Sequence, residues 1–308
     1  MRDRVAGSVL GLAVGDALGA PFEFRRAYEI PSPVPAFELG WMGMPPGTWT
    51  DDTALARTLS RSLIEHGRLD TKDVLRRHLE WLATDPPDVG NQTRLALAEA
   101  ARGTPDAARV VFERRGPEVS AGNGSVAYCA PLGVAYANAP DRLHELGPAL
   151  SAITHADERC GTACLAVTLA VAALVRGEDP TRAVVGAVTE CEGRGGAEEL
   201  GYLVEQAGRS RPVDGPDMGF ALFAAGLGLG SAVEAPGFEE GLRSVVALGG
   251  DTDTNAAVAG ALLGARDGGD ALPAAWVQRL ADREAIEREA GELAELAERG
   301  PVATRGSP

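Results

Sequence analysis

Lysine is almost absent from this chain of 308 residues, which contains Lys72 alone. Dispersed arginines supply the other basic charges, and 44 Asp and Glu against 29 Lys and Arg give a formal net charge of −15. Sequence-independent binding to nucleic acid requires clustered basic side chains that contact phosphates. The composition therefore argues against general nucleic-acid binding, although it leaves room for a local basic pocket that holds a pyrophosphate.

Long apolar runs and paired cysteines are also missing. No run of about 18 apolar residues is free of charge, and Asp16 and Glu23 interrupt the N-terminal segment, so we expect neither a membrane span nor a secretory signal. None of the cysteines forms a Cys-x-x-Cys pair, which favours reduced structural thiols. They are Cys129, Cys160, Cys164 and Cys191. We expect a cytoplasmic protein, with a monomer as the favoured state.

Strand signals are scarce. Aromatic residues make up only 5% of the chain, Ala dominates the apolar residues, and alternating β-branched runs are rare. Apolar residues recur instead at helical spacing, and the predicted helices are 4–20, 51–66, 71–83, 91–102, 125–138, 141–153, 159–175, 180–191, 196–207, 219–229, 238–247, 253–265 and 273–297. The pattern predicts an all-α, compact, single-domain multi-helix protein over residues 1–299, followed by a disordered tail at 300–308.

The N-terminal part of the chain contains a regular glycine spacing and a Pro-rich segment. Gly7, Gly11, Gly15 and Gly19 recur four residues apart in the first predicted helix, which favours close packing against another helix. The Pro-rich segment 25–48 then reads as a long loop. A loop of that length is either the rim of an active site or a plain connector, and its length allows both.

Carboxylates and hydroxyls crowd together in two stretches, 50–53 (Thr-Asp-Asp-Thr) and 251–254 (Asp-Thr-Asp-Thr). Each opens a predicted helix, where Thr and Asp are also ordinary capping residues. A cap needs one oxygen, whereas each stretch supplies several, and divalent cations such as Mg²⁺ or Mn²⁺ prefer several oxygen ligands. An EF-hand is excluded, because Ala256 and Leu262 stand where that loop requires Gly and Glu.

Five motifs in order carry a family resemblance. They are 15–23 (Gly-Asp-Ala-Leu-Gly-Ala-Pro-Phe-Glu), 50–53, 122–125 (Gly-Asn-Gly-Ser), 154–155 (Thr-His) and 249–255 (Gly-Gly-Asp-Thr-Asp-Thr-Asn). Over roughly residues 1–268 the chain resembles the ADP-ribosylglycohydrolase family, the relatives of dinitrogenase-reductase-activating glycohydrolase. The resemblance implies an orthogonal helix bundle and a binuclear centre of two divalent cations, Mg²⁺ or Mn²⁺. Carried over position by position, the metal ligands are Thr50, Asp51, Asp52, Asp251, Asp253 and Thr254.

The resemblance also assigns a role to Glu23, the acidic residue that ends the first motif. It implies proton transfer, either as a base toward water or as an acid toward the leaving group. The alternative from the residues alone is a surface Glu at the end of the first helix. Asp16 lies inside the same motif, and we expect it to have a structural role, capping or bonding a nearby helix end.

Substrate contacts are implied for a further set of residues, namely Asn91, Gly122, Asn123, Gly124, Ser125 and His155. A glycine loop before a helix can bind a phosphate through its backbone N–H groups, although Asn-Gly is also a common turn pair. An isolated His is more often structural than functional. Many relatives carry Met-Arg where this chain has Ala127-Tyr128, which changes the pattern directly after the loop.

The implied activity is a metal-dependent hydrolase that cleaves the glycosidic bond at the anomeric carbon of ADP-ribose. The partner is an ADP-ribosylated acceptor, either a protein side chain or a small molecule. Two alternatives stay open: a catalytically silent relative that binds ADP-ribose or serves structurally, and a hydrolase of a small ADP-ribose derivative. The sequence leaves the acceptor open among arginine, serine, a nucleic-acid base and a small molecule.

Overall fold

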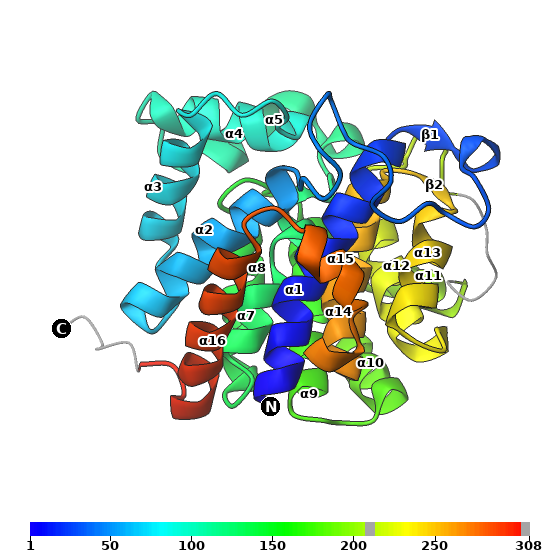
Figure 1. The fold of residues 1–308 in the computed structure, drawn as a ribbon. Helices are drawn as coiled ribbons and strands as arrows, with labels where there is room; N and C mark the ends of the chain where they lie inside the picture. The colour runs from blue at the N-terminus through cyan, green and yellow to red at the C-terminus, as the bar shows by residue number, and fades with distance from the viewer. Residues whose placement is uncertain (207–212, 303–308) are drawn as a thin grey trace.

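Helices form nearly all of the regular structure, which confirms the all-α prediction (Figure 1). The computed structural model describes residues 1–206 and 213–302. Within these ranges the only strands are β1 (Arg25–Arg26) and β2 (Gly249–Gly250), which pair antiparallel. The helices are α1 (Arg2–Gly19), α2 (Asp51–His66), α3 (Thr71–Leu82), α4 (Asn91–Ala101), α5 (Ala107–Arg115), α6 (Gly124–Ala127), α7 (Ala130–Ala135), α8 (Leu143–Ser151), α9 (Glu158–Val175), α10 (Pro180–Thr189), α11 (Ala197–Gln206), α12 (Ala221–Glu234), α13 (Phe238–Val246), α14 (Thr252–Asp267), α15 (Ala274–Arg279) and α16 (Arg283–Arg299).

Two predicted helices are each broken in two, and one helix was not predicted. The helix expected at 125–138 is two short helices, α6 and α7, because Pro131 in the first turn of α7 lacks the N–H that a continuous helix needs. The helix expected at 273–297 breaks before α16, where Asp282 adopts φ +56°. Helix α5 was not predicted at all, since the glycines and prolines on either side of it suggested one long break.

The predicted C-terminal tail falls largely outside the described residues. Its first part, 300–302, is described, and the N–H of Val302 donates to the carbonyl of Gly67 (2.8 Å). The remainder of the tail, 303–308, and the last position of the helix expected at 196–207 are not described.

Helices α1 and α14 pack with their backbones in close approach (Figure 1). The glycines spaced four apart in α1 all face α14, where an added Cβ would lie closer than 3.0 Å to a backbone oxygen. Gly260 and Gly264 of α14 face α1 in the same way. The hydroxyl of Thr252, at the start of α14, donates to the carbonyl of Gly19 (2.8 Å) and fixes the end of the contact. This packing confirms the prediction from the glycine spacing and holds the start of α14 beside the end of α1.

Gly264→Ala should destabilise the fold, because the new Cβ would collide with the backbone oxygen of Gly7, which cannot rotate away. We expect the free energy of unfolding in urea to fall by about 1–3 kcal/mol or more. Gly186→Ala in α10 is the matched control, since a Cβ there meets nothing within 4 Å. This control should leave stability unchanged or raise it by up to about 1 kcal/mol. Equal stability of the two variants would contradict the close-packing interpretation.

Two helices are long and apolar enough to cross a membrane by length and hydropathy alone, one within Arg2–Phe22 and one over Glu158–Val175. In the fold, 89% and 83% of these windows are buried inside the protein. Helix α9 contributes Cys160 and Cys164 to the main hydrophobic core, and all four cysteines are buried and free. Both helices therefore have the surroundings of core helices.

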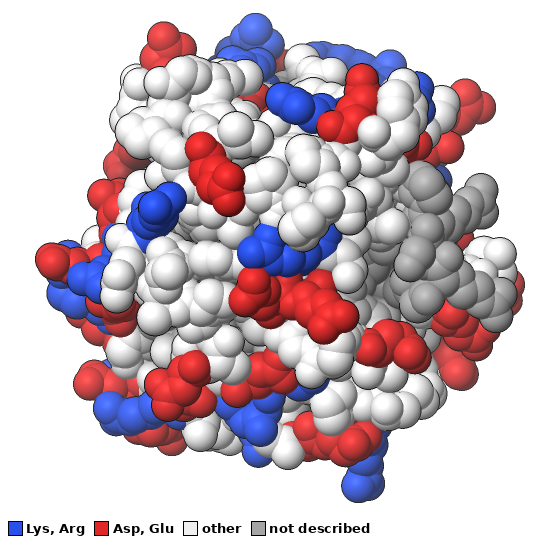
Figure 2. All heavy atoms as spheres, turned by 45° about the vertical axis from the view of Figure 1, so that its right-hand side comes forward, with Lys and Arg blue, Asp and Glu red and all other residues white. Residues whose placement is uncertain are grey.

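The surface carries charges of both signs. On the face drawn in Figure 2, basic side chains occur in separate groups between acidic ones rather than in one stripe. Many of the arginines in the described ranges are paired with acids, as in the contact of Arg76 with Asp73 and Glu80.

Candidate active site

The site forms where the end of α1 meets the starts of α2 and α14. Asp16 of α1 accepts hydrogen bonds from the backbone N–H groups of Thr50 (2.9 Å) and Thr53 (2.9 Å) and from the hydroxyl of Thr53 (2.6 Å). These are free donors at the first turn of α2, so Asp16 holds that helix end in place. The structural role predicted for Asp16 is confirmed.

Both acidic stretches are brought together at this junction. Carboxylate oxygens of Glu23, Asp251 and Asp253 lie within 4.8 Å of one another. The hydroxyl of Thr254 donates to Asp52, which links the start of α14 to the start of α2. Residues about two hundred positions apart in the chain therefore share one acidic centre.

This centre has the donors that a divalent cation needs. Asp52 Oδ2 and Asp253 Oδ1 are buried and have no hydrogen-bond partner among the described residues. Burial raises the pKa of Asp52 and Asp253 well above the usual value, and neighbouring carboxylates raise them further. Burial also raises the pKa of Asp51 to about 7. Uncompensated buried carboxylates are costly, and a cation bound among them removes that cost, so these residues fit divalent metal.

Glu23 is held at the edge of the same centre. It follows a 3₁₀ turn at Ala20–Phe22, and the N–H of Phe24 donates to the carbonyl of Gly250 (2.7 Å) beside the β1–β2 pair. Burial raises the pKa of Glu23 to about 8, with Asp251 adding to the shift. A carboxyl that keeps its proton near neutral pH is suited to acid–base chemistry. The same position among the carboxylates would also allow Glu23 to contact a metal ion.

The Pro-rich segment 25–48 contributes to the site rather than merely connecting helices. Trp41 is buried in this loop, and its side chain donates a hydrogen bond to Glu23. Of the two alternatives for this loop, the active-site rim is the one that the structure supports.

The glycine loop 122–125 lies against the acidic centre. The side-chain amide of Asn123 donates to Asp251 Oδ2 (3.0 Å). Ser125 is fully buried, and its hydroxyl lies 3.0 Å from that of Ser151. An anion at this loop would therefore meet backbone N–H groups of the first turn of α6 rather than the Ser125 hydroxyl.

His155 lies directly under the glycine loop. A Cβ added to Gly122 or Gly124 would meet its ring at 3.3 or 3.2 Å. The ring is 2% exposed, and its Nδ1 lies 2.9 Å from the hydroxyl of Thr154. Burial lowers the pKa of His155 to about 4, so the imidazole is neutral at neutral pH. The ring can support the loop or form a hydrogen bond with a substrate, but it offers no positive charge to attract a phosphate.

The loop before α4 contributes through the neighbours of the predicted contact residue rather than through that residue itself. The predicted contact residue Asn91 is exposed at the start of the helix. Its neighbour Gly90 instead donates its N–H to Asp51 Oδ2 (2.9 Å), and the side chain of Gln92 contacts the carbonyl of Thr154 (3.4 Å). Sequence reasoning missed Trp41, which no motif singles out.

The departure at Ala127-Tyr128 lies in the core. Both side chains are buried, the Tyr128 hydroxyl is 3.3 Å from that of Thr154, and its ring packs edge-on against His78. The two residues that differ from the family pattern therefore contact the Thr154 and His155 pair from the core side and do not reach the acidic centre.

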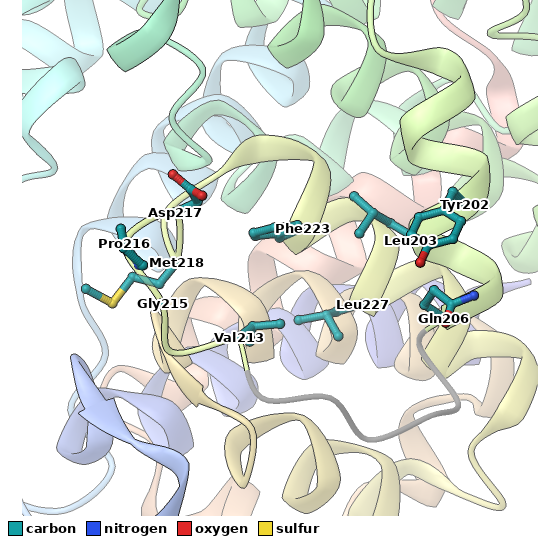
Figure 3. Close-up of a pocket in the computed structure, with 10 residues that line it drawn as sticks. All are labelled: Tyr202, Leu203, Gln206, Val213, Gly215, Pro216, Asp217, Met218, Phe223 and Leu227. Atoms are coloured by element: carbon teal, nitrogen blue, oxygen red, sulfur yellow. The ribbon is translucent and has the colours of Figure 1, made fainter.

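Two cavities lie beyond the glycine loop. One, of about 510 Å³, borders Gly122, and in it the guanidinium of Arg159 lies 5.5 Å from the ring centroid of Phe220. The other, of about 250 Å³, is apolar: Figure 3 shows Phe223 and Leu227 pointing into it from α12 and Leu203 from α11. Neither cavity is lined by the clustered carboxylates, so the reacting centre lies elsewhere.

The chain is similar to known proteins over nearly its whole length. The family model of ADP-ribosylglycohydrolase matches residues 1–302. The chain is 33% identical to the ADP-ribosyl-[dinitrogen reductase] glycohydrolase of Rhodospirillum rubrum, over 91% of each chain. It is 26% identical to the ADP-ribosylarginine hydrolase Tri1 of Pseudomonas putida, covering 94% of this chain and 78% of that one. It is 26% identical to the ADP-ribosylhydrolase ARH3 of Homo sapiens, covering 89% and 88%. A solved ADP-ribosylglycohydrolase-related protein complex contains a chain that superposes with a TM-score of 0.81 at 35% identity, covering 96% of this chain and 98% of that one.

Proposed function

Because the chain belongs to the ADP-ribosylglycohydrolase family, we propose that it is a metal-dependent hydrolase that releases ADP-ribose from a modified acceptor. The bond cleaved joins the acceptor to the anomeric carbon of the ribose. The observation that carries this proposal is the cluster of Glu23 with Asp251 and Asp253 of the second acidic stretch, close enough to Asp52 of the first stretch for that carboxylate to raise the pKa of Asp253. An acid–base group beside a cation site is the arrangement that a metal-assisted hydrolysis requires.

The proposed cofactor is a pair of divalent cations, Mg²⁺ or Mn²⁺. Six residues would hold them, namely Thr50, Asp51, Asp52, Asp251, Asp253 and Thr254. When bound, such ions polarise oxygen ligands, lower the pKa of a water and orient neighbouring hydroxyls such as those of a ribose. The carboxylates supply the negative charge that offsets the unfavourable position of a cation at two helix N-termini.

The residues around the ions have separate tasks. Asp16 keeps the first turn of α2 in register, and Asn123 and Gly90 orient Asp251 and Asp51 through hydrogen bonds. Such partners fix the direction of a carboxylate toward its ligand. The glycine loop and the neutral ring of His155 support the diphosphate side of the substrate.

Glu23 performs the proton transfer. In the overall reaction, the oxygen of a water bonds to the anomeric carbon, the bond from that carbon to the acceptor breaks, and one water proton ends on the acceptor. Glu23 can hold the proton in between, because its pKa is raised by burial and by Asp251. The carboxyl of Glu23 thus takes a proton from the reacting water and gives a proton to the leaving group.

A panel of ADP-ribosylated acceptors tests this proposal. Arginine-, serine- and base-linked substrates are incubated with the protein and each metal, and free ADP-ribose is measured. Release that depends on Mg²⁺ or Mn²⁺ supports a hydrolase, and the preferred acceptor separates protein substrates from small derivatives. Thermal stabilisation by ADP-ribose without release from any acceptor would instead indicate a silent binding protein.

We further propose that the protein is cytoplasmic and monomeric. The buried free thiols agree with a reducing compartment such as the cytoplasm.

A further inference from the structure

The glycine loop offers a diphosphate little positive charge of its own. Helix α6, which begins in this loop, has only four residues, so few peptide dipoles add together at its start. The ring of His155 beneath the loop is neutral, and the guanidinium of Arg159 in the neighbouring cavity is paired with Asp157 (2.7 Å). Because a diphosphate is strongly anionic, a cation that is not already paired is expected elsewhere around this loop.

Arg115, the last residue of α5, lies close to the loop. Its Nη1 donates to Oε1 of Gln92 (3.2 Å). Gln92 in turn lies against the loop, since a Cβ added to Gly122 would be 3.9 Å from the Cβ of Gln92. Burial lowers the pKa of His155, and Arg115 is close enough for its charge to lower that pKa further. Arg115 therefore has one neighbour of the loop as its hydrogen-bond partner and lies near a second.

No carboxylate neutralises the charge of Arg115. Among the described residues, no Asp or Glu forms an ion pair with it, and its hydrogen-bond partner is the neutral amide of Gln92. The adjacent Arg114 differs, because its guanidinium is 3.0 Å from Glu99 and its side chain is 64% exposed. A half-buried guanidinium without an acidic partner favours an anion that presents two oxygens, since the planar group can bond both at once.

Gln92 holds the guanidinium beside the loop. It lies in the first turn of α4 and is 7% exposed. Its Oε1 accepts from Arg115, and its Nε2 donates to the carbonyl of Thr154 (3.4 Å). Both ends of the amide are engaged, which fixes its orientation. Because a guanidinium has several N–H donors, Arg115 can keep this contact and still bond a ligand.

We propose that Arg115 binds the diphosphate of ADP-ribose and that Gln92 positions it for this contact. The inference rests on the proposed function, since it adds a binding residue for the same substrate. The glycine loop then contributes backbone N–H groups, and Arg115 contributes the positive charge that the loop and His155 lack.

Arg115→Gln should weaken the binding of ADP-ribose by about 10- to 100-fold, the contribution of a hydrogen bond to a charged group. Glutamine can still donate to Gln92 but carries no charge. The Kd is measured by calorimetry at saturating Mg²⁺ or Mn²⁺. Arg114→Gln is the matched control, because it removes one positive charge from the adjacent residue, whose guanidinium pairs with Glu99. This control should leave the Kd unchanged, and an equal loss in both variants, or in neither, would overturn the assignment.

Arg115→Lys separates the charge of the side chain from its shape. The substitution keeps a positive charge but not the planar group that bonds two oxygens, so the Kd should lie between those of the parent and of Arg115→Gln. Added KCl should weaken ADP-ribose binding by the parent more than by Arg115→Gln, because the variant lacks one charge–charge contact. Equal Kd values for the two variants, with the same salt dependence as the parent, would refute a contact between Arg115 and the diphosphate.

Turnover distinguishes a direct contact from a structural effect on the loop. The diphosphate does not react, so a contact to it is equally strong in the bound substrate and in the transition state, and its loss raises KM without lowering kcat. Arg115→Gln should therefore raise KM by the same factor as the Kd and keep the kcat and the melting temperature of the parent. A lower kcat with an unchanged KM would contradict the inference.

Gln92→Leu tests the positioning role through a double-mutant cycle. The substitution removes the partner of Arg115 and should weaken ADP-ribose binding in the parent background. In the Arg115→Gln background it should have no further effect on the Kd, because the group that it positions is gone. The lost contact with Thr154 is common to both backgrounds and cancels in the comparison. An equal loss in both backgrounds would show that Gln92 does not act through Arg115.

The outcomes also separate this inference from the proposed function. A protein that binds ADP-ribose but releases it from no acceptor refutes the hydrolase, while the Kd values of Arg115→Gln and Arg114→Gln still decide the role of Arg115. A hydrolase whose Kd is the same in the parent and in Arg115→Gln keeps the function and refutes the inference. A parent protein that binds no ADP-ribose refutes both.

Discussion

Asp253→Ala should reduce ADP-ribose release by about 1,000-fold or more, because the interactions a bound cation makes with developing charge contribute several kcal/mol and each 1.36 kcal/mol is tenfold in rate. The Asp253 carboxylate is 3% exposed, lies in the carboxylate group with Glu23 and Asp251, and has one oxygen without a partner among the described residues.

Stability measurements distinguish this loss from unfolding. Without metal, the variant should melt near the parent temperature, because the carboxyl that it loses is buried among other carboxylates, and both burial and these neighbours raise its pKa. Mg²⁺ or Mn²⁺ should then raise the melting temperature of the parent, because the ion binds only the folded state. It should not raise that of the variant, which lacks one of the oxygen ligands. Asp267→Ala, at the other end of α14 and paired with Arg266 rather than with the centre, is the matched control. Full activity and metal content in Asp253→Ala would show that the ligand set is wrong.

Most helices could be predicted because their boundaries depend on local signals. Asp70, Asp157 and Asp179 accept hydrogen bonds from the first turns of α3, α9 and α10, as capping residues do. Gly67 ends α2 in a left-handed conformation. The breaks before α7 and α16 were missed, because apolar spacing continues across them while the chain changes direction to pack on other helices.

The acidic centre was predictable because each half is a continuous motif. Which residues surround it was less so, since those contacts join distant segments: Trp41 reaches Glu23 from a loop, and Gly90 reaches Asp51 from the start of another helix. Asp88 carries no motif of its own, and only the fold brings it close enough to Glu23 to raise the pKa of that group. Ser125 illustrates the opposite case, a motif residue whose side chain faces the core.

Glu23→Gln should bind ADP-ribose nearly as well as the parent and turn over about 100- to 10,000-fold more slowly, the range typical of a lost acid–base group. Glutamine keeps the length of the side chain and an oxygen that can accept the hydrogen bond from Trp41. It cannot take up and return a proton. Binding is measured by calorimetry at saturating metal, and turnover on the best acceptor of the panel.

The position of Glu23 beside Asp251 and Asp253 makes metal content the decisive additional readout, because a carboxylate so placed could hold an ion instead of a proton. If proton transfer is its task, Glu23→Gln retains the metal-induced rise in melting temperature and loses rate alone, in contrast to Asp253→Ala. The rate that remains should also depend less on pH, because the group that titrates in the parent is gone. A variant that loses both metal and rate would make Glu23 a ligand. Unchanged turnover would leave it a structural residue at the end of α1, and lost ADP-ribose binding with unchanged turnover at saturation would make it a residue that positions the substrate.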